Sequence, residues 1–374
     1  MKIEAFGVEE WMNDWETRCD WNIAETCVES ITVKELMQMA GVSATQLSSD
    51  LMQKKLTYGW IEGSARVREL IAGLYQKQSP SNVITTHGCI GANQLVHRSL
   101  VERGDHVISV IPTYQQHYSI PASFGAEIET LRLEPEDGFL PNLEKLASMV
   151  RPNTKLICIN NPNNPTGALI PNEDLIKICD IARSVGAWVL CDEVYRGLNQ
   201  DDSEYPLSVA DIYEKGVSTS GMSKVFSMAG IRFGWVAAPE SLIKEILHQR
   251  DYDTISVGMI DEYFAEMALS VKDKILERNR AVIRKNLPIL DAWVQQEPRV
   301  SYVKPKAGTT AFVKIDTTLS SYDFCVKLVK ETGVMVTPGS ALHTEGYVRI
   351  GYANNVEILN EGLARFSEFL KTAP

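Results

Sequence analysis

The chain repeats one local pattern, in which a short apolar run stops abruptly at polar residues and is followed by a stretch with helical periodicity. The clearest runs cover residues 83–86, 156–159 and 188–191, and similar runs lie at 217–220 and 235–238. Unbroken apolar runs of this length are typical of strands that are buried on both faces. Because such strands alternate with helices, the sequence predicts a largely parallel sheet with helices on both sides. In sheets of this kind, ligands bind at the carboxyl ends of the strands.

The size and composition of the chain are sufficient for one large domain and a smaller one. The chain has 374 residues, of which 44% are hydrophobic and 23% are charged, as in an ordinary soluble globular protein. From about residue 275 the pattern changes to a long charged helix that continues through Trp293, followed by short strand-like segments separated by helical ones. This change predicts a smaller α+β domain in the C-terminal part of the chain.

Charge and cysteine content argue against several classes of function. The formal net charge of −11 disfavours a nucleic-acid surface, which needs a basic stripe. No apolar run is long enough to cross a bilayer, so we expect no membrane partner. The acidic start of the chain lacks the order of a secretory signal, and we expect a cytoplasmic protein. The seven cysteines include no Cys-x-x-Cys pair, so we expect neither disulfides nor a metal site.

The stretch 218–235 places one lysine, Lys224, beside small and apolar residues, with the glycine-flanked Arg232 farther along. An amine in a confined and partly desolvated position loses its proton more easily and becomes a nucleophile toward carbonyl groups. We therefore expect the pKa of Lys224 to be lowered. An ordinary exposed lysine is the alternative interpretation of this stretch taken alone.

Further candidate residues stand where predicted strands end or predicted helices begin. A glycine turn at 88–91 separates the first strand from a helix, and free backbone amides at a helix start bind anions such as phosphate. Tyr58 lies on a glycine-bounded loop, where a partly buried packing role is an equal alternative to a functional one. The candidates beyond the other strands are Tyr114, Asn164, Asp192 and Tyr195.

Three motifs, NNPNNPTG, DEVY and SKVFSMAGIRFGW, follow one another along the chain. With the glycine turn and the aromatic residue before them, they resemble the class I/II aminotransferases, pyridoxal 5'-phosphate enzymes of the aspartate aminotransferase fold, over nearly the whole chain. The resemblance implies an α/β fold, with a large domain whose mostly parallel sheet lies between helices and a smaller α+β domain formed by the N- and C-terminal segments. The implied division is 1–45 and 271–374 for the small domain and 46–270 for the large cofactor-binding domain.

The resemblance implies a role for each candidate residue near the cofactor ring. Lys224 would bind the cofactor aldehyde as a Schiff base and later act as the general base at the substrate Cα. Asp192 would keep the pyridine nitrogen protonated. Tyr195 and Asn164 would donate hydrogen bonds to the phenolate oxygen, and Tyr114 would stack on the ring.

The resemblance also implies how the cofactor phosphate and the substrate are held. The phosphate would rest on the amides of Gly88, Cys89 and Ile90, with Arg232 as a bidentate cation. Tyr58 would reach the phosphate of the neighbouring subunit, which implies a homodimer with shared sites. Arg349 would bind the substrate α-carboxylate, with Asn164 beside it. Related enzymes often carry a serine where this chain has Gly221, so Ser220 or Ser223 is expected to supply the phosphate hydroxyl instead.

The implied reaction moves an amino group between an L-amino acid and a 2-oxo acid. The alternative is elimination or C–S cleavage, which uses the same lysine and aspartate and which the motifs do not separate from transamination. A regulator that keeps the cofactor as a sensed ligand is a third interpretation. We disfavour it because we expect no DNA-binding extension and because the chain is acidic.

The expected substrate specificity rests on two glutamates before the helix predicted at 32–40. Glu25 and Glu29 lie in a loop where carboxylates are usually solvated, but in the family this region lines the side-chain end of the substrate pocket. A partly desolvated carboxylate rejects a second carboxylate. None of the motifs supplies a second arginine for a dicarboxylate, and Arg18 cannot be placed from sequence. We therefore predict a neutral or basic donor in preference to aspartate or glutamate.

Overall fold

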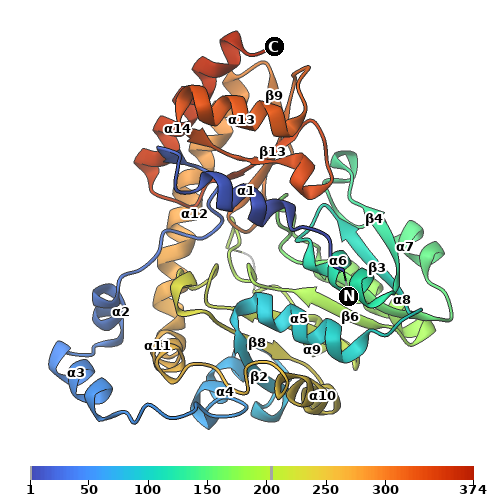
Figure 1. Cartoon of the computed structure of the whole chain (residues 1–374), viewed down its shortest axis with the longest axis vertical. Coiled ribbons are helices and arrows are strands. Elements are labelled where there is room, and N and C mark those ends of the chain that lie inside the picture. The colour runs from blue at the N-terminus through green and yellow to red at the C-terminus, as the bar shows by residue number, and fades with distance from the viewer. Residues whose placement is uncertain (1, 203–204) are drawn as a thin grey trace.

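A computed structural model describes residues 2–202 and 205–374 of the chain (Figure 1). In these residues a seven-stranded sheet has the order β2-β8-β7-β6-β5-β3-β4. Its strands are β2 (Val83–His87), β3 (His106–Ile111), β4 (Glu127–Arg132), β5 (Thr154–Asn160), β6 (Trp188–Asp192), β7 (Gly216–Gly221) and β8 (Phe233–Ala237).

Apart from β8, the described strands of this sheet all run in one direction. The strands from β4 through β7 pair in parallel, whereas β8 pairs antiparallel with both β7 and β2. Two antiparallel steps restore the direction, so β2 runs the same way as β7. The expectation of a largely parallel sheet is confirmed. As a result, the residues that follow β2, β5, β6 and β7 meet the residues that precede β8 at one edge of the sheet.

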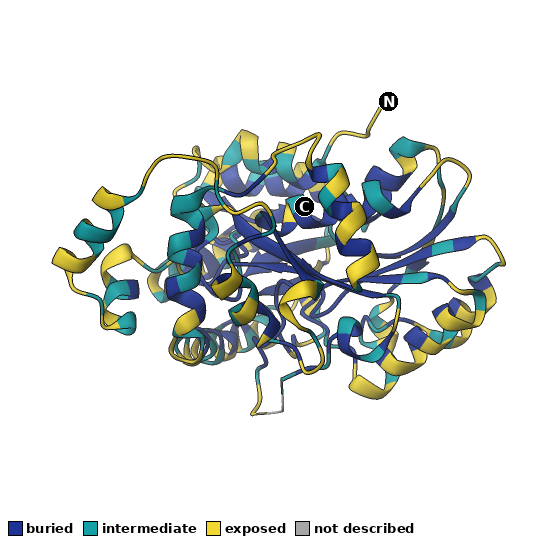
Figure 2. Ribbon diagram, turned by 90° about the horizontal axis from the view of Figure 1, so that it is seen from below, coloured by how far each residue is buried: buried dark blue, intermediate teal, exposed yellow. Residues whose placement is uncertain are grey.

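Helices lie on both faces of the large sheet, and the strands between them are buried (Figure 2). Helix α5 packs on β7 and β8 through an apolar face that includes Ala92, Val96 and Leu100 at helical spacing. The helices of this part are α4 (Ala65–Ala72), α5 (Gly88–Leu100), α6 (Gln116–Phe124), α7 (Leu143–Met149), α8 (Asn172–Val185), α9 (Val209–Ile212), α10 (Glu240–Arg250) and α11 (Met259–Ser270).

A smaller α+β part is built from both ends of the chain, as expected (Figure 1). Near the N-terminus, β1 (Trp21–Asn22) pairs in parallel with β11 (Val334–Met335). A second, antiparallel sheet has the order β12-β13-β10-β9. Its strands are β9 (Val300–Tyr302), β10 (Thr310–Ile315), β12 (Thr337–Pro338) and β13 (Tyr347–Gly351). The helices are α1 (Gly7–Trp15), α12 (Lys272–Gln296), α13 (Ser321–Thr332) and α14 (Val356–Thr372).

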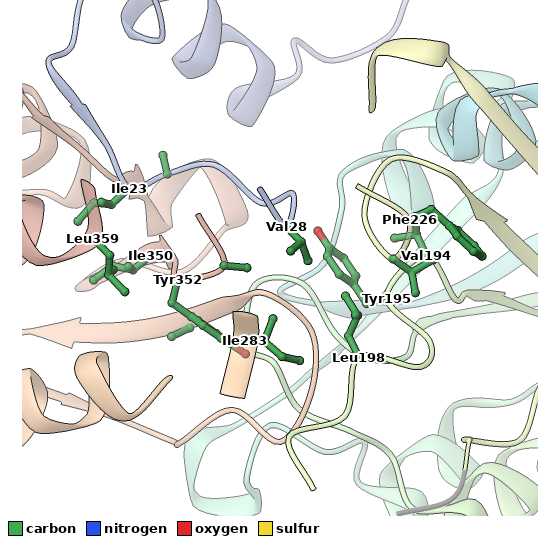
Figure 3. Packing of buried hydrophobic residues seen from close by; sticks show 14 of the residues in the cluster. Ile23, Val28, Val194, Tyr195, Leu198, Phe226, Ile283, Ile350, Tyr352 and Leu359 are labelled. Carbon is green, nitrogen blue, oxygen red and sulfur yellow. The ribbon is translucent and has the colours of Figure 1, made fainter. Parts of the chain in front are cut away.

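One continuous apolar cluster joins the two parts of the molecule. Figure 3 shows Ile23 from the N-terminal segment and Leu359 from α14 in the same cluster as Tyr195 and Phe226, which follow strands of the large sheet. Each of these side chains is at most 2% exposed. Because burial of apolar surface drives folding, a shared cluster of this kind stabilises both parts together.

Helices α2 (Val33–Ala40) and α3 (Ala44–Gln53) form an arm beside the rest of the molecule in Figure 1. The expected helix at 32–40 is confirmed: Thr32 and Glu35 form a capping box, and Gly41 ends the helix with a φ of 69°. Helix α3 has no fully buried residue among those described, although Leu47 packs against an apolar cluster and Asp50 accepts a hydrogen bond from the hydroxyl of Tyr263.

The expected glycine turn at 88–91 is wrong in one respect. Helix α5 begins at Gly88, so these glycines form its first turn and not a loop before it. Gly88 has a φ of 68°, a conformation that glycine adopts at little cost, and this allows the chain to enter the helix directly from β2.

Among the described residues, no helix has the length and apolar character needed to span a membrane.

Candidate active site

A cavity of about 410 Å³ opens where the carboxyl ends of β5 and β6 approach the small antiparallel sheet. This volume is in the range of small-molecule sites. Most of the candidate residues from the sequence line it, although they come from distant segments of the chain. These residues are Cys89, Ile90, Tyr114, Asn164, Asp192, Tyr195, Ser223, Lys224, Arg232 and Arg349.

Lys224 stands just beyond the end of β7 and is half-buried. Its Nζ donates a hydrogen bond to Oγ1 of Thr26 over 2.5 Å and lies 3.3 Å from Sγ of Cys27. Burial lowers the pKa of this amine, but Cys27, Tyr195 and Glu25 raise it by more, so the pKa lies above its ordinary value. The expectation of a lowered pKa is therefore wrong. The apolar neighbours of Lys224 were visible in the sequence, but the acid brought close by the N-terminal segment was not.

Asp192, the last residue of β6, is 5% exposed and is surrounded by hydrogen-bond donors. It accepts hydrogen bonds from Nδ2 of Asn93 at 2.9 Å and from the backbone N–H of Val194 at 3.1 Å, and Nε2 of His117 lies 3.6 Å away. Burial alone raises the pKa of this carboxyl, but His117, Asn93 and Val194 outweigh burial and hold the pKa below its usual value. Asp192 is thus a buried carboxylate that remains ionised at neutral pH.

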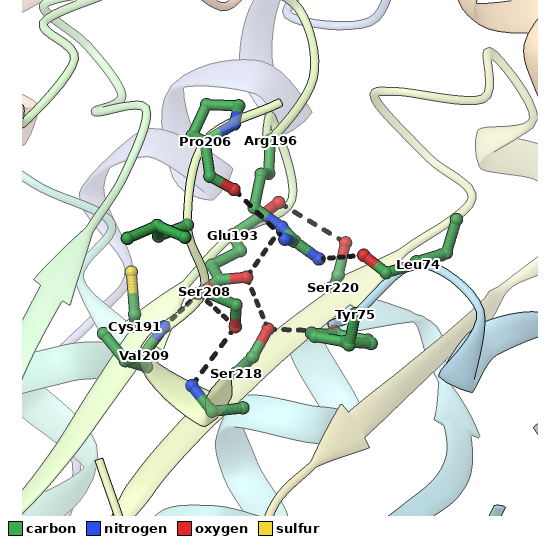
Figure 4. Close-up of polar contacts among 12 residues, drawn as sticks. Leu74, Tyr75, Cys191, Glu193, Arg196, Pro206, Ser208, Val209, Ser218 and Ser220 are labelled. Atoms are coloured by element: carbon green, nitrogen blue, oxygen red, sulfur yellow. Dashed lines mark hydrogen bonds and ion pairs between the residues drawn. The ribbon is translucent and has the colours of Figure 1, made fainter. Parts of the chain in front are cut away.

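Glu193, which lies between Asp192 and Tyr195 in the chain, is held by several polar contacts (Figure 4). Its carboxylate lies 2.9 Å from Nε of Arg196 and accepts hydrogen bonds from the hydroxyls of Ser208 and Ser218 at 2.9 and 2.8 Å. A buried ion pair stabilises a structure only when further hydrogen bonds satisfy its remaining polar atoms, and the two serines meet this condition. Glu193 therefore holds the backbone between the two candidate residues in one conformation.

Three segments pack closely against one another beside Arg232: the start of α5, the end of β7 and the start of β8. A Cβ added to Gly234 would lie 2.3 Å from the carbonyl carbon of Gly88, so the second glycine of the Gly-x-Arg-x-Gly motif is required for this approach. A Cβ on Gly88 would lie 3.1 Å from Nη2 of Arg232. No side chain caps the first turn of α5 in the described structure. The uncapped backbone amides of α5 and the guanidinium of Arg232 therefore lie close together, as the donors of an anion-binding site do.

The structure explains the glycine at position 221 and distinguishes the two candidate serines. A Cβ on Gly221 would lie 2.9 Å from the carbonyl oxygen of Phe233, so no serine fits there without a shift of β8. Ser220 is buried in β7, and its hydroxyl donates to the carbonyl oxygen of Glu193 over 3.4 Å, away from the cavity. Ser223 lines the cavity.

Arg349 on β13 forms the opposite wall of the cavity and is 3% exposed. Its guanidinium donates to Oδ1 of Asn164 at 3.3 Å and to Oγ1 of Thr337 at 3.1 Å. Its Nε is buried and has no hydrogen-bond partner among the described residues. Burial lowers the pKa of Arg349. Because an unpaired buried donor is unfavourable, this arginine is suited to receive an anionic ligand.

Tyr58 and Gly88 do not line the cavity. Tyr58 is 74% exposed on the loop after α3, so the packing role within this chain is wrong. Of the two glutamates expected at the substrate side chain, Glu25 is half-buried and lines the cavity, whereas Glu29 is exposed and is not a lining residue. The alternative of a solvated carboxylate is therefore wrong for Glu25, and the expectation of a residue that lines the substrate pocket is wrong for Glu29. Arg18 is exposed and is not a lining residue either.

Several lining residues were missed in the sequence. Val8, Glu9 and Met12 on α1 and Glu16 just after it recur at the spacing of one helix face. That spacing was the available signal, but the N-cap of α1 is Phe6, which offers no side-chain cap, so no start signal marked the helix. Thr26 and Cys27 contact Lys224 from a loop that carried no motif.

Comparison with known proteins agrees with this geometry. The family model for aminotransferases of class I and II matches residues 28–366. Capreomycidine synthase of Streptomyces vinaceus is 28% identical over 371 residues, which cover 99% of this chain and 95% of that protein. Aspartate aminotransferase of Pyrococcus horikoshii is 30% identical over 334 residues, which cover 85% of each. A solved PLP-dependent aminotransferase structure from Streptococcus suis is 44% identical with a TM-score of 0.96, and the match covers 100% of this chain and 99% of that one.

The family match extends over most of the chain and includes the strand ends around Lys224, Asp192 and Arg232, as well as Arg349 in the small part. The chain therefore belongs to the class I and II aminotransferases, a family of enzymes that depend on pyridoxal 5'-phosphate.

Proposed function

We propose that this aminotransferase moves an amino group between an L-amino acid and a 2-oxo acid in the cavity around Lys224. One observation carries the proposal. One cavity is lined by an amine just beyond β7, a buried carboxylate at the end of β6 and a buried arginine on β13, namely Lys224, Asp192 and Arg349. These are the groups that bind an aldehyde, a pyridine nitrogen and a carboxylate.

The residues at one end of the cavity fit the phosphate of pyridoxal 5'-phosphate. The uncapped amides at 88–90 and the guanidinium of Arg232 supply the donors, and Ser223 adds a hydroxyl from the same side. Gly88 leaves the space that Arg232 needs, because a Cβ there would lie 3.1 Å from its Nη2. A doubly charged phosphate would be neutralised at this end without a metal ion.

The residues on the floor and sides of the cavity fit the cofactor ring. Asp192 stays ionised, so it can hold a proton on the pyridine nitrogen, and Asn93 and His117 keep its carboxylate in place. Tyr195 and Asn164 stand at the edge of the cavity with donors available for the ring oxygen. Tyr114 lines the same cavity and is held by its hydroxyl, which donates to Oε1 of Glu9 at 2.8 Å.

When bound, the cofactor supplies an electron-accepting ring that takes up the electron pair left when the substrate Cα proton departs. Lys224 would hold the cofactor covalently, and its amine would be the general base for the substrate Cα proton. Cys27, Tyr195 and Glu25 raise the pKa of its amine above the ordinary value, so the amine would have to lose a proton before it could attack the cofactor aldehyde. Thr26 and Cys27 orient Nζ over the site.

Arg349 binds the substrate α-carboxylate and thereby places the Cα within reach of Lys224. Two of its bonds, to Asn164 and Thr337, hold the guanidinium in position, and the unpaired Nε is free to donate to the ligand. The amide of Asn164 contacts both this arginine and the side of the cavity proposed for the ring. It therefore links substrate binding to cofactor orientation.

The proposed working unit is a homodimer in which Tyr58 completes the phosphate site of the partner subunit. The support is an apolar run on the loop after α3 that this chain leaves uncovered. Exposed fractions there are 88% for Leu56, 74% for Tyr58 and 69% for Trp60. A contiguous exposed apolar patch of this kind is typical of a protein interface.

We also propose domain divisions at 45/46 and 270/271 and a cytoplasmic location. The large sheet lies between Val83 and Ala237, and α12 begins at Lys272, which supports the second division. The described cysteines are all free, and only Cys19 is not buried, which is typical of a reducing compartment.

Single-turnover and steady-state assays test the proposed reaction. Mixing the purified holoenzyme with an amino acid alone should convert the cofactor once and release one equivalent of 2-oxo acid. Continuous turnover should require a second 2-oxo acid. Sustained release of ammonia without a second 2-oxo acid would instead identify an elimination enzyme.

A further inference from the structure

Three glutamates from the N-terminal segment line one side of the cavity. Glu9 lies on the face of α1 that also carries Met12, and Glu16 follows that helix. Glu25 lies on the loop whose next two residues contact Nζ of Lys224. All three carboxylates line the same cavity, and burial, then Glu25 and then Glu9 raise the pKa of Glu16. These carboxylates stand apart from Asp192, which is enclosed by its own donors.

The cations of the cavity do not balance this charge once the cofactor and substrate are bound. Among the described lining residues, the cations are Lys224, Arg232 and Arg349. In the proposed function Arg232 would pair with the phosphate and Arg349 with the α-carboxylate, and Lys224 would be the base that takes up the Cα proton, so its amine carries no charge before that step. Among the described lining residues no cation is then left to accept a second carboxylate, whereas three glutamates line the same cavity.

Glu25 is the glutamate best placed to act. Its Oε1 accepts hydrogen bonds from the backbone N–H groups of Thr26 and Cys27, both at 2.8 Å, so neither donor uses the second carboxylate oxygen. Burial raises the pKa of Glu25, but Lys224 and these local hydrogen bonds lower it by more, so the side chain is ionised. Glu16 has the opposite shift because burial, Glu25 and Glu9 all raise its pKa. A cation placed between Glu25 and Glu16 would relieve this repulsion.

A second observation shows that the cavity is built for a ligand with an anionic end. Arg349 lines the same cavity and is only 3% exposed, and its buried Nε has no hydrogen-bond partner among the described residues. The cavity thus offers a donor for a carboxylate on one wall and an excess of carboxylates on another. A ligand that satisfies both carries an α-carboxylate and, at its other end, a positive charge.

We propose, on the basis of the proposed function, that the amino donor is an L-amino acid with a cationic side chain, an ammonium or guanidinium group, held by Glu25 with Glu16 beside it. Glu9 has a smaller part because its Oε1 already accepts the hydroxyl of Tyr114. A guanidinium suits the pair best, since its planar fork can donate to two carboxylates at once.

A kinetic panel tests the assignment. The values of kcat/KM for arginine, ornithine and lysine should exceed those for methionine and phenylalanine, and aspartate and glutamate should be the poorest donors. In Glu25→Gln the ratio of arginine to methionine should fall roughly 10- to 30-fold, as for the loss of a partly desolvated ion pair. Glu16→Gln should lower the ratio by a smaller factor.

Two substitutions control for charge alone. Glu29→Gln removes a charge from the same loop and Glu10→Gln from the same helix, yet neither residue lines the cavity, so the ratio should stay within about twofold. If these controls lower the ratio as much as Glu25→Gln does, the effect is a long-range field and the proposed contact is wrong. If aspartate or phenylalanine is the best donor of the unmodified enzyme, the substrate class is wrong.

Binding without turnover gives an independent readout. 5-Guanidinopentanoate has no α-amino group and cannot react, and calorimetry should show that it binds more tightly than hexanoate or glutarate. That preference should be lost in Glu25→Gln and kept in Glu29→Gln. If the enzyme converts no amino acid, the proposed function is wrong. If it converts amino acids but binds glutarate more tightly than 5-guanidinopentanoate, only this inference is wrong.

Discussion

Nζ of Lys224 lies 2.5 Å from Oγ1 of Thr26, so a residue 198 positions earlier in the chain touches the atom that is proposed to hold the cofactor. The contact exists because β1 pairs with β11 and thereby fixes the N-terminal segment across the cavity. Any event that changes the charge on Nζ therefore also changes a hydrogen bond of the N-terminal segment. In the proposed function, cofactor binding and the position of that segment are therefore coupled through this pair.

Replacement of Lys224 by alanine should abolish the covalent link to the cofactor while the protein stays folded. The reason is that Lys224 is the only lysine among the described residues that line the cavity. After borohydride reduction, intact mass should show the cofactor adduct in the unmodified protein and in Lys177→Ala, a change at an exposed lysine. An adduct retained in Lys224→Ala would falsify the assignment.

Ser223→Ala should weaken cofactor binding about tenfold, because one hydroxyl donor to a charged phosphate is lost. Ser220→Ala should change the cofactor Kd far less, since that hydroxyl points to the carbonyl of Glu193 and not into the cavity. Fluorescence titration of the cofactor-free variants measures both constants. Equal losses in the two variants would contradict the distinction drawn between these serines.

Mixing two inactive or impaired variants should restore activity if the sites are shared between subunits. Tyr58→Phe would impair the site of the partner subunit, whereas Lys224→Ala inactivates the site of the subunit that carries it. A hybrid dimer of the two variants therefore has one site with both changes and one site with neither. Activity of the mixture should exceed the sum of the two separate proteins once the subunits exchange, as followed by native mass spectrometry of tagged chains. No recovery after demonstrated exchange would rule out the shared site.

The protein should lose stability as the pH falls below about 6.5, in part because of His97. Burial, and then His117, lower the pKa of this imidazole well below the value of 6.5 that it has when unfolded. Above that value both states are neutral and His97 contributes nothing. Below it only the unfolded state takes up a proton, so the free energy of unfolding falls by up to about 1.4 kcal/mol per pH unit until the folded pKa is reached.

His97→Phe isolates this contribution, because neither ring nitrogen of His97 has a hydrogen-bond partner among the described residues. Urea unfolding at pH 7.5, 6.5 and 5.5 (roughly one unit on each side of the unfolded pKa) should show a smaller loss in the variant than in the unmodified protein. His248→Gln, at an exposed histidine, should behave like the unmodified protein. Parallel losses in all three proteins would mean that carboxylates alone cause the acid sensitivity.

Much of the fold was predictable because its signals are local. Runs such as 156–159 and 188–191 are apolar for the whole length of a buried strand, and Gly41 ends its helix by a conformation that glycine favours. The direction of β8 had no such signal, since direction depends on which strands pair and not on the residues within one strand.

The candidate site, like the fold, has features that were predictable from the sequence and features that were not. Asp192 and Lys224 follow strands within recognisable motifs, so the sequence placed them correctly in the cavity. The raised pKa of Lys224 and the role of Glu16 could not be predicted, because each depends on charges that only the folded chain brings together. The role of Tyr58 could not be predicted from this chain alone, because its exposed side chain has a function only in the proposed homodimer.

The parallel pairing of β1 with β11 has an evolutionary consequence. The side chains proposed to act at the reacting atoms come from the large sheet and β13, whereas the glutamates proposed to contact the substrate side chain come from a short stretch before residue 26. Selection could therefore exchange the amino acid that an ancestor accepted by altering that leading stretch, while the catalytic apparatus was inherited intact. Grafting residues 8–25 between relatives of this chain is the corresponding route for a protein engineer.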